Sequence, residues 1–454
     1  MLMRFNVKNF LSFDEIQEFS MIPGDVRSKS NHLIKEKNIN LLRFAALYGP
    51  NASGKSNFIK ALHFSRNLIR NGAENAPKNY YYKLNETRSS EPTSFEYEIN
   101  IGDKYYAFGF NIILSENRFT GEWLYELKPS GDQLIYERDI VNKNFNKNLS
   151  FVKNESKLRF KIYSEDSLDN DKFLFLSELN RNKEEFFKNF KEFRIFKNIF
   201  NWFTDTLDIN FPSNPVSSTD FFVDNDKSNN NRLFKLLDSL GTGITDFKLV
   251  NTPIEEMKKQ FPIKILEDIQ NKLFENSESI AHIRSDNNLH QLQLDDKGDL
   301  EVKTMYFTHG NNGADFALSE ESDGTRRLLD LLEILLGKSE KTYVIDEIDR
   351  SLHPNLTHKF IQLFLEILHE KKIQLIITTH EDRLLDLNLL RRDEIWFVQK
   401  NEEGNSQLYS LEKFKTRFDK KIINAYLDGR YGAVPKFKNL SFLEEEEEER
   451  GGQD

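Results

Sequence analysis

Runs and alternations of apolar residues divide the first part of the chain into strands and helices. Residues 4–10 alternate between apolar and polar positions, and residues 41–48 form a largely apolar run that ends at Gly49. Both patterns predict sheet strands. From Lys55 onward apolar residues recur with the helical period, and Gly72 follows as a suitable cap. The pattern therefore predicts a strand, a loop and a helix in succession.

Beyond this helix the character of the chain changes twice. Residues 95–101 and 104–114 flank a short Gly-Asp turn, which predicts a hairpin. After residue 116 the chain is rich in Asn, Lys and Phe, and we expect an insertion there with a long helix over 177–203. This stretch has no sustained heptads, so we do not expect a long coiled-coil arm.

Phenylalanines recur near helical spacing along the expected long helix. A stripe of this kind is most often part of a core, and a partner-binding groove is the alternative. The two interpretations differ in how exposed the rings should be. The positions are Phe186, Phe187, Phe190, Phe193 and Phe196.

The last third of the chain returns to strands that alternate with helices. Segments around Asp296-Lys297-Gly298 predict strands within 285–308, and an apolar helix follows Gly324 with Gly337 as its cap. Alternation of strands and helices predicts an α/β fold with a mostly parallel sheet. Further strands are expected at 342–345, 375–378 and 394–398.

The strongest motif is the glycine-rich loop between the apolar run at 41–48 and the helix that begins at Lys55. It matches the P-loop pattern and has the strand and helix context that this mechanism requires. Backbone N–H groups of such a loop surround phosphates, Lys55 reaches the β- and γ-phosphates, and the Ser56 hydroxyl ligates Mg²⁺. The predicted ATP site consists of Gly49, Pro50, Asn51, Ala52, Ser53, Gly54, Lys55, Ser56 and Asn57.

Two adjacent carboxylates, Asp346 and Glu347, end the apolar strand at 342–345. Ligands of parallel sheets bind at the carboxyl ends of the strands, where both side chains would emerge. Alone, such a short pattern is weak, but downstream of a P-loop it indicates a Walker B motif. In this motif Asp346 holds Mg²⁺, and Glu347 is the catalytic residue that orients or deprotonates the attacking water.

A further apolar strand, residues 374–379, ends in His380. A lone histidine is usually structural, but this one comes one helix and one strand after the expected Walker B motif. The switch histidine of ABC-type ATPases occupies the same topological position. We therefore predict that His380 is catalytic and contacts the γ-phosphate.

The segment 321–327 resembles the ABC signature in its position before the Walker B strand. Ser322 and Gly324 stand at the serine and the second glycine, whereas Asp323 departs from the usual first glycine. Ser319 is a second candidate, and Ser322 is preferred because a glycine follows it two residues later. A hydroxyl at a helix N-terminus forms a phosphate site without a base or metal of its own. We expect the signature residues Ser322, Asp323, Gly324 and Thr325 to complete a neighbour's P-loop in trans.

Composition adds bounds on compartment and partners. The chain has 454 residues, no cysteine and a net charge of −10. The absence of cysteine excludes disulfides and thiolate zinc sites, and the acidic balance argues against coating nucleic acid, although a local basic groove stays open. No apolar run is long enough to cross a membrane, so we expect a cytoplasmic protein. The acidic run at 444–449 predicts a solvated tail, with a docking role as the alternative.

Four segments of the C-terminal third, IDEIDRSLHPNL, QLIITTH, LRRDEIWFVQK and AYLDGRYGAVP, make a family resemblance specific. They resemble the ABC/SMC-type, OLD-like AAA family ATPases of bacterial anti-phage defence, such as AriA of the PARIS system and the AbiL ATPase. The resemblance covers about residues 1–115 and 305–435 and is weak between them. It implies a P-loop NTPase fold of the ABC/SMC-head type, with ATP and Mg²⁺ as cofactors.

The resemblance also implies how the chain is organised and what it assembles with. We expect ATP hydrolysis, a homo-oligomer of paired heads, a separately encoded effector such as a Toprim-type nuclease, and a phage-encoded trigger. The fold would combine a mostly parallel sheet, an antiparallel β subdomain and a largely helical insertion. The expected domains are the N-terminal part of the head (1–115), an insertion that is largely helical with some β (116–304), the C-terminal part of the head (305–435) and an acidic disordered tail (436–454).

Three functions fit these motifs to different degrees. The first is a defence ATPase that acts as sensor or scaffold for an effector nuclease in trans, and the second is an SMC/RecF-like DNA-repair ATPase that clamps DNA. The third, a self-contained OLD-type nuclease, needs a Toprim domain, yet little foldable sequence follows Pro435. The acidic charge, the lack of arms and the resemblance favour the first. No residue is assigned to a Gln-loop.

Overall fold

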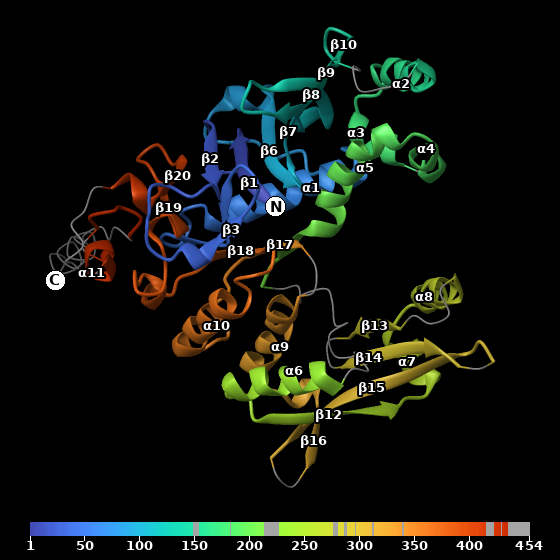
Figure 1. The fold of residues 1–454 in the computed structure, drawn as a ribbon, viewed down its shortest axis with the longest axis vertical. Helices are drawn as coiled ribbons and strands as arrows, with labels where there is room; N and C mark the ends of the chain where they lie inside the picture. Colours follow the sequence, from blue (N-terminus) through green and yellow to red (C-terminus); the bar gives the residue numbers. More distant parts are fainter. Residues whose placement is uncertain are drawn as a thin grey trace, which may run out of the picture. The chain divides into compact units, whose positions relative to one another are not determined.

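The computed structural model describes residues 1–148, 154–181, 183–212, 227–275, 280–285, 288–295, 297–310, 313–337, 340–414, 422–427 and 429–434. The expected acidic tail and Asp296 of the expected turn lie outside these residues. The chain forms two compact units, one of Met1–Ile209 with the described residues from Gln374 on, and one of Asn210–Ile373. In Figure 1 the first unit runs from blue to green and resumes in orange to red.

The first unit contains an antiparallel sheet of seven strands in the order β10-β9-β8-β7-β6-β1-β2. The alternation at 4–10 corresponds to β1 (Leu2–Lys8), and the expected hairpin is formed by β6 (Thr93–Ile101) and β7 (Lys104–Ile113). Both predictions are confirmed. The remaining strands are β2 (Gln17–Ser20), β8 (Arg118–Leu127), β9 (Gln133–Asp139) and β10 (Asn144–Lys147).

A second set of strands in the first unit carries the glycine-rich loop. β5 (Phe44–Tyr48) pairs in parallel with β18 (Ile373–Thr378) and with β19 (Ile395–Lys400), as the alternation of strands and helices predicted. β20 (Ser406–Ser410) adds an antiparallel edge to β19. Helix α1 (Lys55–Asn71) follows the loop and has Gly72 as its C-cap, which confirms the predicted helix and its cap.

The apolar run at 41–48 is two strands, where the sequence predicted one. It divides at Arg43 into β5 and β4 (Asn40–Leu42), which pairs with β3 (Leu33–Lys35). The Arg43 N–H donates to the His32 carbonyl at 3.0 Å, and the Arg43 carbonyl accepts from the Leu375 N–H at 2.8 Å. The strand therefore changes its hydrogen-bonding partner at Arg43, which an apolar pattern does not reveal.

Helix α1 is fixed by contacts with the antiparallel sheet. The Phe58 ring lies against Phe5 and Phe19, with centroid separations of 5.8 and 5.1 Å. Two turns further along α1, the Ser65 hydroxyl forms a hydrogen bond with the Tyr97 hydroxyl at 2.6 Å. All five side chains are buried. The helix N-terminus that follows the glycine-rich loop is therefore held by a rigid aromatic core.

The expected long helix over 177–203 is wrong. The chain forms the short helices α3 (Phe175–Asn180), α4 (Glu184–Asn189) and α5 (Arg194–Asn201), followed by a π-helical turn at Trp202–Thr206. The breaks let the phenylalanines enclose Phe160 of α2 (Asn154–Ser167), whose ring stacks on Phe193 at 5.4 Å. The core interpretation of the stripe is confirmed, because Phe186, Phe187, Phe193 and Phe196 are buried and Phe190 is half-buried.

The antiparallel sheet continues past residue 116, so the compact units do not follow the expected domain boundaries. Glu122 on β8 forms a buried ion pair with Arg138 on β9, at 3.3 Å, and accepts the N–H groups of Phe175 and Leu176 at 2.6 and 3.0 Å. These bonds attach the start of α3 to the sheet. The division between the units falls at Ile209, within β11 (Leu207–Asn210), because the residues before it are packed into the first unit.

The second unit combines a sheet with several helices. Its strands follow the order β12-β15-β14-β13, and β16 pairs with the end of β15. The strands expected within 285–308 are confirmed as β14 (Leu289–Leu294) and β15 (Leu300–His309). The other elements are α6 (Lys227–Ser239), β12 (Ile244–Asn251), α7 (Ile254–Gln260), α8 (Ile263–Glu275), β13 (Ala281–Arg284), β16 (Ala314–Ala317), α9 (Asp323–Leu336), β17 (Lys341–Ile345) and α10 (Pro354–Ile367).

Strand and helix share residues 116–304, the segment expected to be an insertion that is largely helical with some β. Residues 116–304 supply β8 to β14 and the start of β15, in addition to α2 through α8. Within the described part of the chain, no helix has both the length and the apolar character that a membrane crossing requires.

Candidate nucleotide site

The loop between β5 and α1 has the backbone that a phosphate cradle needs. Ala52 and Gly54 have positive φ values of 62° and 114°, and α1 begins directly after Gly54. A Cβ at Gly49 would lie 2.3 Å from the Val398 carbonyl oxygen. A Cβ at Gly54 would lie 2.4 Å from the Ser406 hydroxyl oxygen. Glycine is therefore required at both positions, by close approach at Gly49 and by backbone conformation and close approach at Gly54.

Lys55 is the charged side chain of this loop, and it is buried. Its exposed fraction is 5%, and its Nζ donates to the carbonyl oxygens of Gly49 at 2.6 Å and Pro50 at 3.2 Å. The ammonium thus lies inside the curve of the loop, next to the positive end of the helix dipole of α1. Ser56, the next residue, is half-buried in the first turn of α1.

A chain of hydroxyl groups holds the loop from outside. Ser406 Oγ donates to the Ser53 carbonyl at 2.6 Å and lies 2.8 Å from Ser12 Oγ, from which it can accept. Asn57 Nδ2 in turn donates to Ser12 Oγ at 2.8 Å. Ser12 follows β1 and Ser406 begins β20, so the two serines are far apart in the sequence. Sequence reasoning missed both, because neither belongs to a short motif.

The segment that presents Ser12 has an unusual backbone. Asn9 and Leu11 have positive φ values of 52° and 51°, which is rare for a bulky residue such as leucine. The Asn9 side chain donates to the carbonyls of Arg88 at 2.8 Å and Glu91 at 3.1 Å. These bonds hold the turn, and with it Ser12, against the N-terminus of α1.

The first unit brings His380 beside the loop. A cavity of about 1180 Å³ is lined by residues 49–53, Thr379, His380 and Asp382, with Tyr426 of α11 (Ile422–Leu427) on another wall. His380 is exposed, whereas Thr379 is fully buried and its Oγ1 accepts the Glu381 N–H at 2.9 Å. Burial raises the pKa of Asp382, and Glu381 raises it further. The strand expected before His380 is confirmed as β18, while the switch position and the catalytic role of His380 stay predictions.

The second unit holds the two expected Walker B carboxylates at the end of β17. Asp346 is 4% exposed, and its N–H donates to the Asn210 carbonyl at 2.9 Å. Glu347 has a positive φ of 47°, and its carbonyl accepts the Arg350 N–H at 3.0 Å. A left-handed glutamate is a strained conformation of the kind that clusters at functional sites.

The second unit also contains the expected signature. Ser322 is the N-cap of α9, and its Oγ accepts the Thr325 N–H at 3.1 Å. Ser322 and Asp323 are exposed, whereas a Cβ at Gly324 would lie 3.0 Å from the Ser351 carbonyl. Ser319 lies in a 3-10 turn (Leu318–Glu320) and not at the helix N-terminus. Ser322, and not Ser319, is therefore the serine at the N-terminus of α9.

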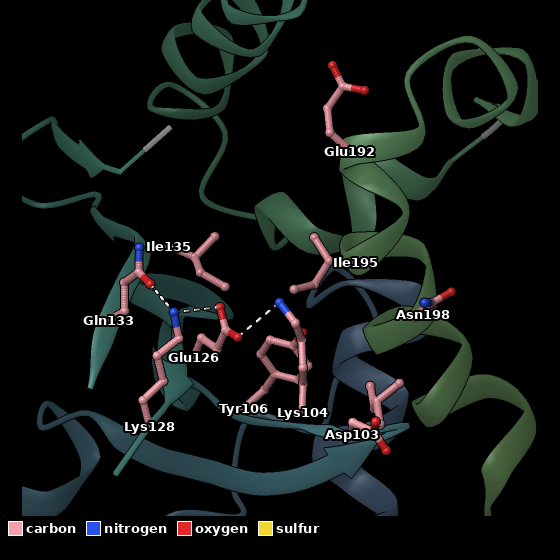
Figure 2. A pocket seen from close by; sticks show the side chains of 11 residues that line it. Asp103, Lys104, Tyr106, Glu126, Lys128, Gln133, Ile135, Glu192, Ile195 and Asn198 are labelled. Carbon is pink, nitrogen blue, oxygen red and sulfur yellow. Dashed lines mark hydrogen bonds and ion pairs between the residues drawn. The ribbon is translucent and has the colours of Figure 1, made fainter. Parts of the chain in front are cut away.

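A second cavity of the first unit contains none of the predicted site residues. It measures about 870 Å³ and lies between the strands β7 to β9 and helix α5. Figure 2 shows Lys104 and Lys128 turned toward the carboxylate of Glu126, at 3.0 and 3.4 Å, with Ile135 and Ile195 on facing walls. One glutamate therefore pairs with both lysines, and the charges of this wall are largely satisfied within the protein.

A glycine-rich loop between a buried parallel strand and a helix N-terminus, on an α/β fold, defines a P-loop NTPase. Residues 44–386 match the family model described as "AAA domain, putative AbiEii toxin, Type IV TA system". The match spans more than half of the chain, and the chain belongs to this family. No curated protein matches the sequence.

Solved structures of SMC heads are similar to the chain. One is the SmcHead bound to the C-winged helix domain of ScpA, at 14% identity and a TM-score of 0.39, over 91% of this chain and 99% of that chain. A second is the SMC head domain from Thermotoga maritima, at 14% identity and 0.32, over 90% and 98%. A third is the Smc head domain with an extended coiled coil bound to the C-terminal domain of ScpA, derived from Pyrococcus furiosus, at 15% identity and 0.38, over 94% and 99%.

Proposed function

We propose that the chain binds ATP with Mg²⁺ and hydrolyses it as an ABC/SMC-type ATPase, at active sites formed between two paired heads. One observation carries this proposal: the ammonium of Lys55 is buried inside a loop that turns through left-handed Ala52 and Gly54 directly before α1. A cation beside inward-facing N–H groups at a helix N-terminus suits a phosphate chain.

The chemistry assigned to each group follows from its atoms. Ser56 and Asp346 offer the hard oxygen donors that Mg²⁺ prefers, and Mg²⁺ needs only one or two such ligands beside water and phosphate. Among the described residues, no group of three or more His, Asp or Glu side chains could hold a metal ion. With Mg²⁺ held by Ser56 and Asp346, the ion would neutralise charge on the phosphates. Glu347 would activate the attacking water, and His380 would contact the γ-phosphate.

The signature accounts for the pairing of heads. Ser322 presents an exposed hydroxyl at the N-terminus of α9, a helix of 14 residues. Such an end binds phosphate but brings no base or metal, so it completes a site that another subunit supplies. The proposed assembly is therefore a homo-oligomer built from paired heads, in which Ser322, Asp323, Gly324 and Thr325 cover the partner's ATP.

Subunit mixing tests this arrangement. Neither Lys55→Ala nor Ser322→Arg homomers should hydrolyse ATP. The first lacks the lysine of the phosphate cradle, and in the second the arginine prevents the signature from covering the partner's ATP. In a mixed pair one composite site carries both changes and the other carries neither, so turnover should partly recover once subunits exchange. Normal turnover by Ser322→Arg alone, or a mixture that stays inactive although both variants are folded, would refute the composite site.

A second variant separates binding from hydrolysis. Glu347→Gln removes the water-activating carboxylate and leaves Lys55 and Asp346 in place, so it should retain ATP and keep the heads closed. Light scattering with and without ATP measures the pairing. A Glu347→Gln protein that hydrolyses ATP at the normal rate would remove Glu347 from the mechanism.

We propose further that this ATPase serves anti-phage defence as the sensor or scaffold of an effector nuclease of Toprim type, encoded separately. Support comes from the resemblance to defence ATPases in the segments around Asp346 and His380, and from a family description that names a toxin of a TA system. The division into head and insertion, a phage-encoded trigger and a cytoplasmic setting belong to the same proposal.

Co-expression distinguishes this role from DNA clamping. A neighbouring nuclease gene product should co-purify with the wild-type chain, and phage protection should require both proteins and Lys55. In the alternative, the ATP-bound Glu347→Gln variant retains duplex DNA after a salt wash and gives no protection. That second pattern would overturn the defence role and leave the ATPase assignment intact.

A further inference from the structure

A side-chain bond links the hairpin formed by β15 and β16 to the residue directly before Ser322. His309, the last residue of β15, has its Nε2 at 2.6 Å from Oε1 of Glu321. Glu321 is the residue directly before Ser322, the N-cap of α9. In Figure 1 these elements belong to the yellow and orange part of the second unit. A strand of the sheet is thus bonded to the signature.

The partners of this bond are fixed on both sides. The Glu321 side chain is 5% exposed and His309 is 25% exposed. The His309 ring packs edge-on against Phe316 of β16, with centroids 5.1 Å apart, and His309 pairs with Ala314 across the hairpin. The Glu321 N–H donates to the Leu318 carbonyl at 3.3 Å. Because Glu321 is nearly buried, its carboxylate needs this ring N–H as a partner.

We propose that His309 is a positioning residue for the signature: its bond to Glu321 sets where the Ser322 hydroxyl and the α9 N-terminus stand when they meet the partner's ATP. This inference rests on the proposed trans role of Ser322. Along the chain, the 3-10 turn Leu318–Glu320 and Glu321 connect β16 to Ser322, and the His309 bond adds a side-chain link directly to the residue before the N-cap. β15 pairs with both β12 and β14, so displacement of this sheet would be transmitted to Ser322 through His309.

The test uses the full chain and three variants. His309→Ala removes the donor, and His309→Gln keeps an amide N–H close to the position of Nε2. Lys248→Ala is the matched control, because it breaks the 2.8 Å ion pair with Asp315 on the same hairpin without touching Glu321. Steady-state kcat and KM, and the equilibrium Kd for ATP, are measured for each.

A positioning role predicts a specific split. His309→Ala should lower kcat about tenfold, the size of one lost bond to a charged group, while Kd for ATP stays within about threefold because the P-loop is unchanged. His309→Gln should return kcat to within about threefold of wild type. Lys248→Ala should match wild type.

Two results separate failure of this inference from failure of the trans model. If Ser322→Arg is inactive but His309→Ala turns over normally, the inference is wrong and the composite site stands. If Ser322→Arg itself turns over normally, the composite site fails first. Equal losses in His309→Ala and His309→Gln, or loss of ATP binding by His309→Ala, would also overturn the positioning role, because both would reflect general disruption.

Discussion

Three glycine substitutions separate the two reasons for glycine in the loop, which are backbone conformation and close approach of a neighbouring atom. Gly102→Ala tests the backbone alone, because Gly102 has a φ of 59° and a Cβ there would meet nothing within 4 Å. Gly49→Ala tests close approach alone, since the added Cβ would lie 2.3 Å from the Val398 carbonyl oxygen. Gly54→Ala combines a φ of 114° with a Cβ 2.4 Å from Ser406 Oγ.

The structure gives an order of magnitude for each change. A left-handed alanine costs about 1–2 kcal/mol, partly offset by about 0.4–1 kcal/mol from the stiffer unfolded chain, so Gly102→Ala should destabilise by about 1 kcal/mol. Overpacking against a backbone carbonyl should make Gly49→Ala cost about 1–3 kcal/mol. Gly54→Ala should cost about 2–5 kcal/mol, because Ser406 Oγ is bonded to Ser12 and Ser53 and cannot turn away freely.

Urea unfolding, followed by tryptophan fluorescence, measures these differences in the stability of the first compact unit. The chain has 3 tryptophans, and Trp123, Trp202 and Trp396 all lie in the first unit with the loop. Equilibrium ATP binding, measured on folded protein, should be reduced by Gly49→Ala and Gly54→Ala and unchanged by Gly102→Ala. If Gly54→Ala unfolds at the same urea concentration as Gly102→Ala, the close contact with Ser406 has no energetic weight and the reasoning fails.

Three further changes probe charge and burial in the first unit. Lys55→Ala should lose ATP binding by about 1.5–3 kcal/mol with the fold intact, and binding within about threefold of wild type would contradict the P-loop assignment. Glu122→Ala should destabilise by about 3–5 kcal/mol in urea by leaving Arg138 buried without its carboxylate, whereas the exposed control Glu165→Ala should change stability by under about 1 kcal/mol. Burial raises the pKa of Tyr426 from 10.0 to about 12. Its contribution to the free energy of unfolding is therefore complete below pH 10 and is lost as the pH rises toward 12. Tyr426→Phe should reduce this loss of stability at alkaline pH, and an unchanged dependence of stability on pH would contradict the assignment.

The confirmed predictions share a property: each rests on residues that are close in sequence. Strand β5, the glycine-rich loop and α1 follow one another from Phe44 to Asn71, so periodicity and one short motif predicted all three. The hairpin around Gly102 is equally local. Chemistry carried by a contiguous segment can be inferred from spacing alone, because the backbone fixes how neighbours are arranged.

The wrong predictions depended on partners elsewhere in the chain. The run at 41–48 looked continuous, but Arg43 changes partner from His32 to Leu375. The phenylalanines of 186–196 have helical spacing, yet they enclose Phe160, which a single straight helix need not do. In both cases tertiary packing outweighs local periodicity, because burying aromatic area stabilises more than continuing one helix does.

The sequence by itself determined the class of this protein, because a phosphate cradle is a property of one strand, one loop and one helix in succession. Only the tertiary structure decided which side chains support the cradle and which side chain bonds to the segment of the signature. Ser12 and Ser406 meet at Gly54 although they lie at opposite ends of the chain, and His309 meets Glu321 across a hairpin. Hydrogen bonds of this kind depend on distances of about 3 Å that only the folded backbone sets, so no pattern along the chain predicts them.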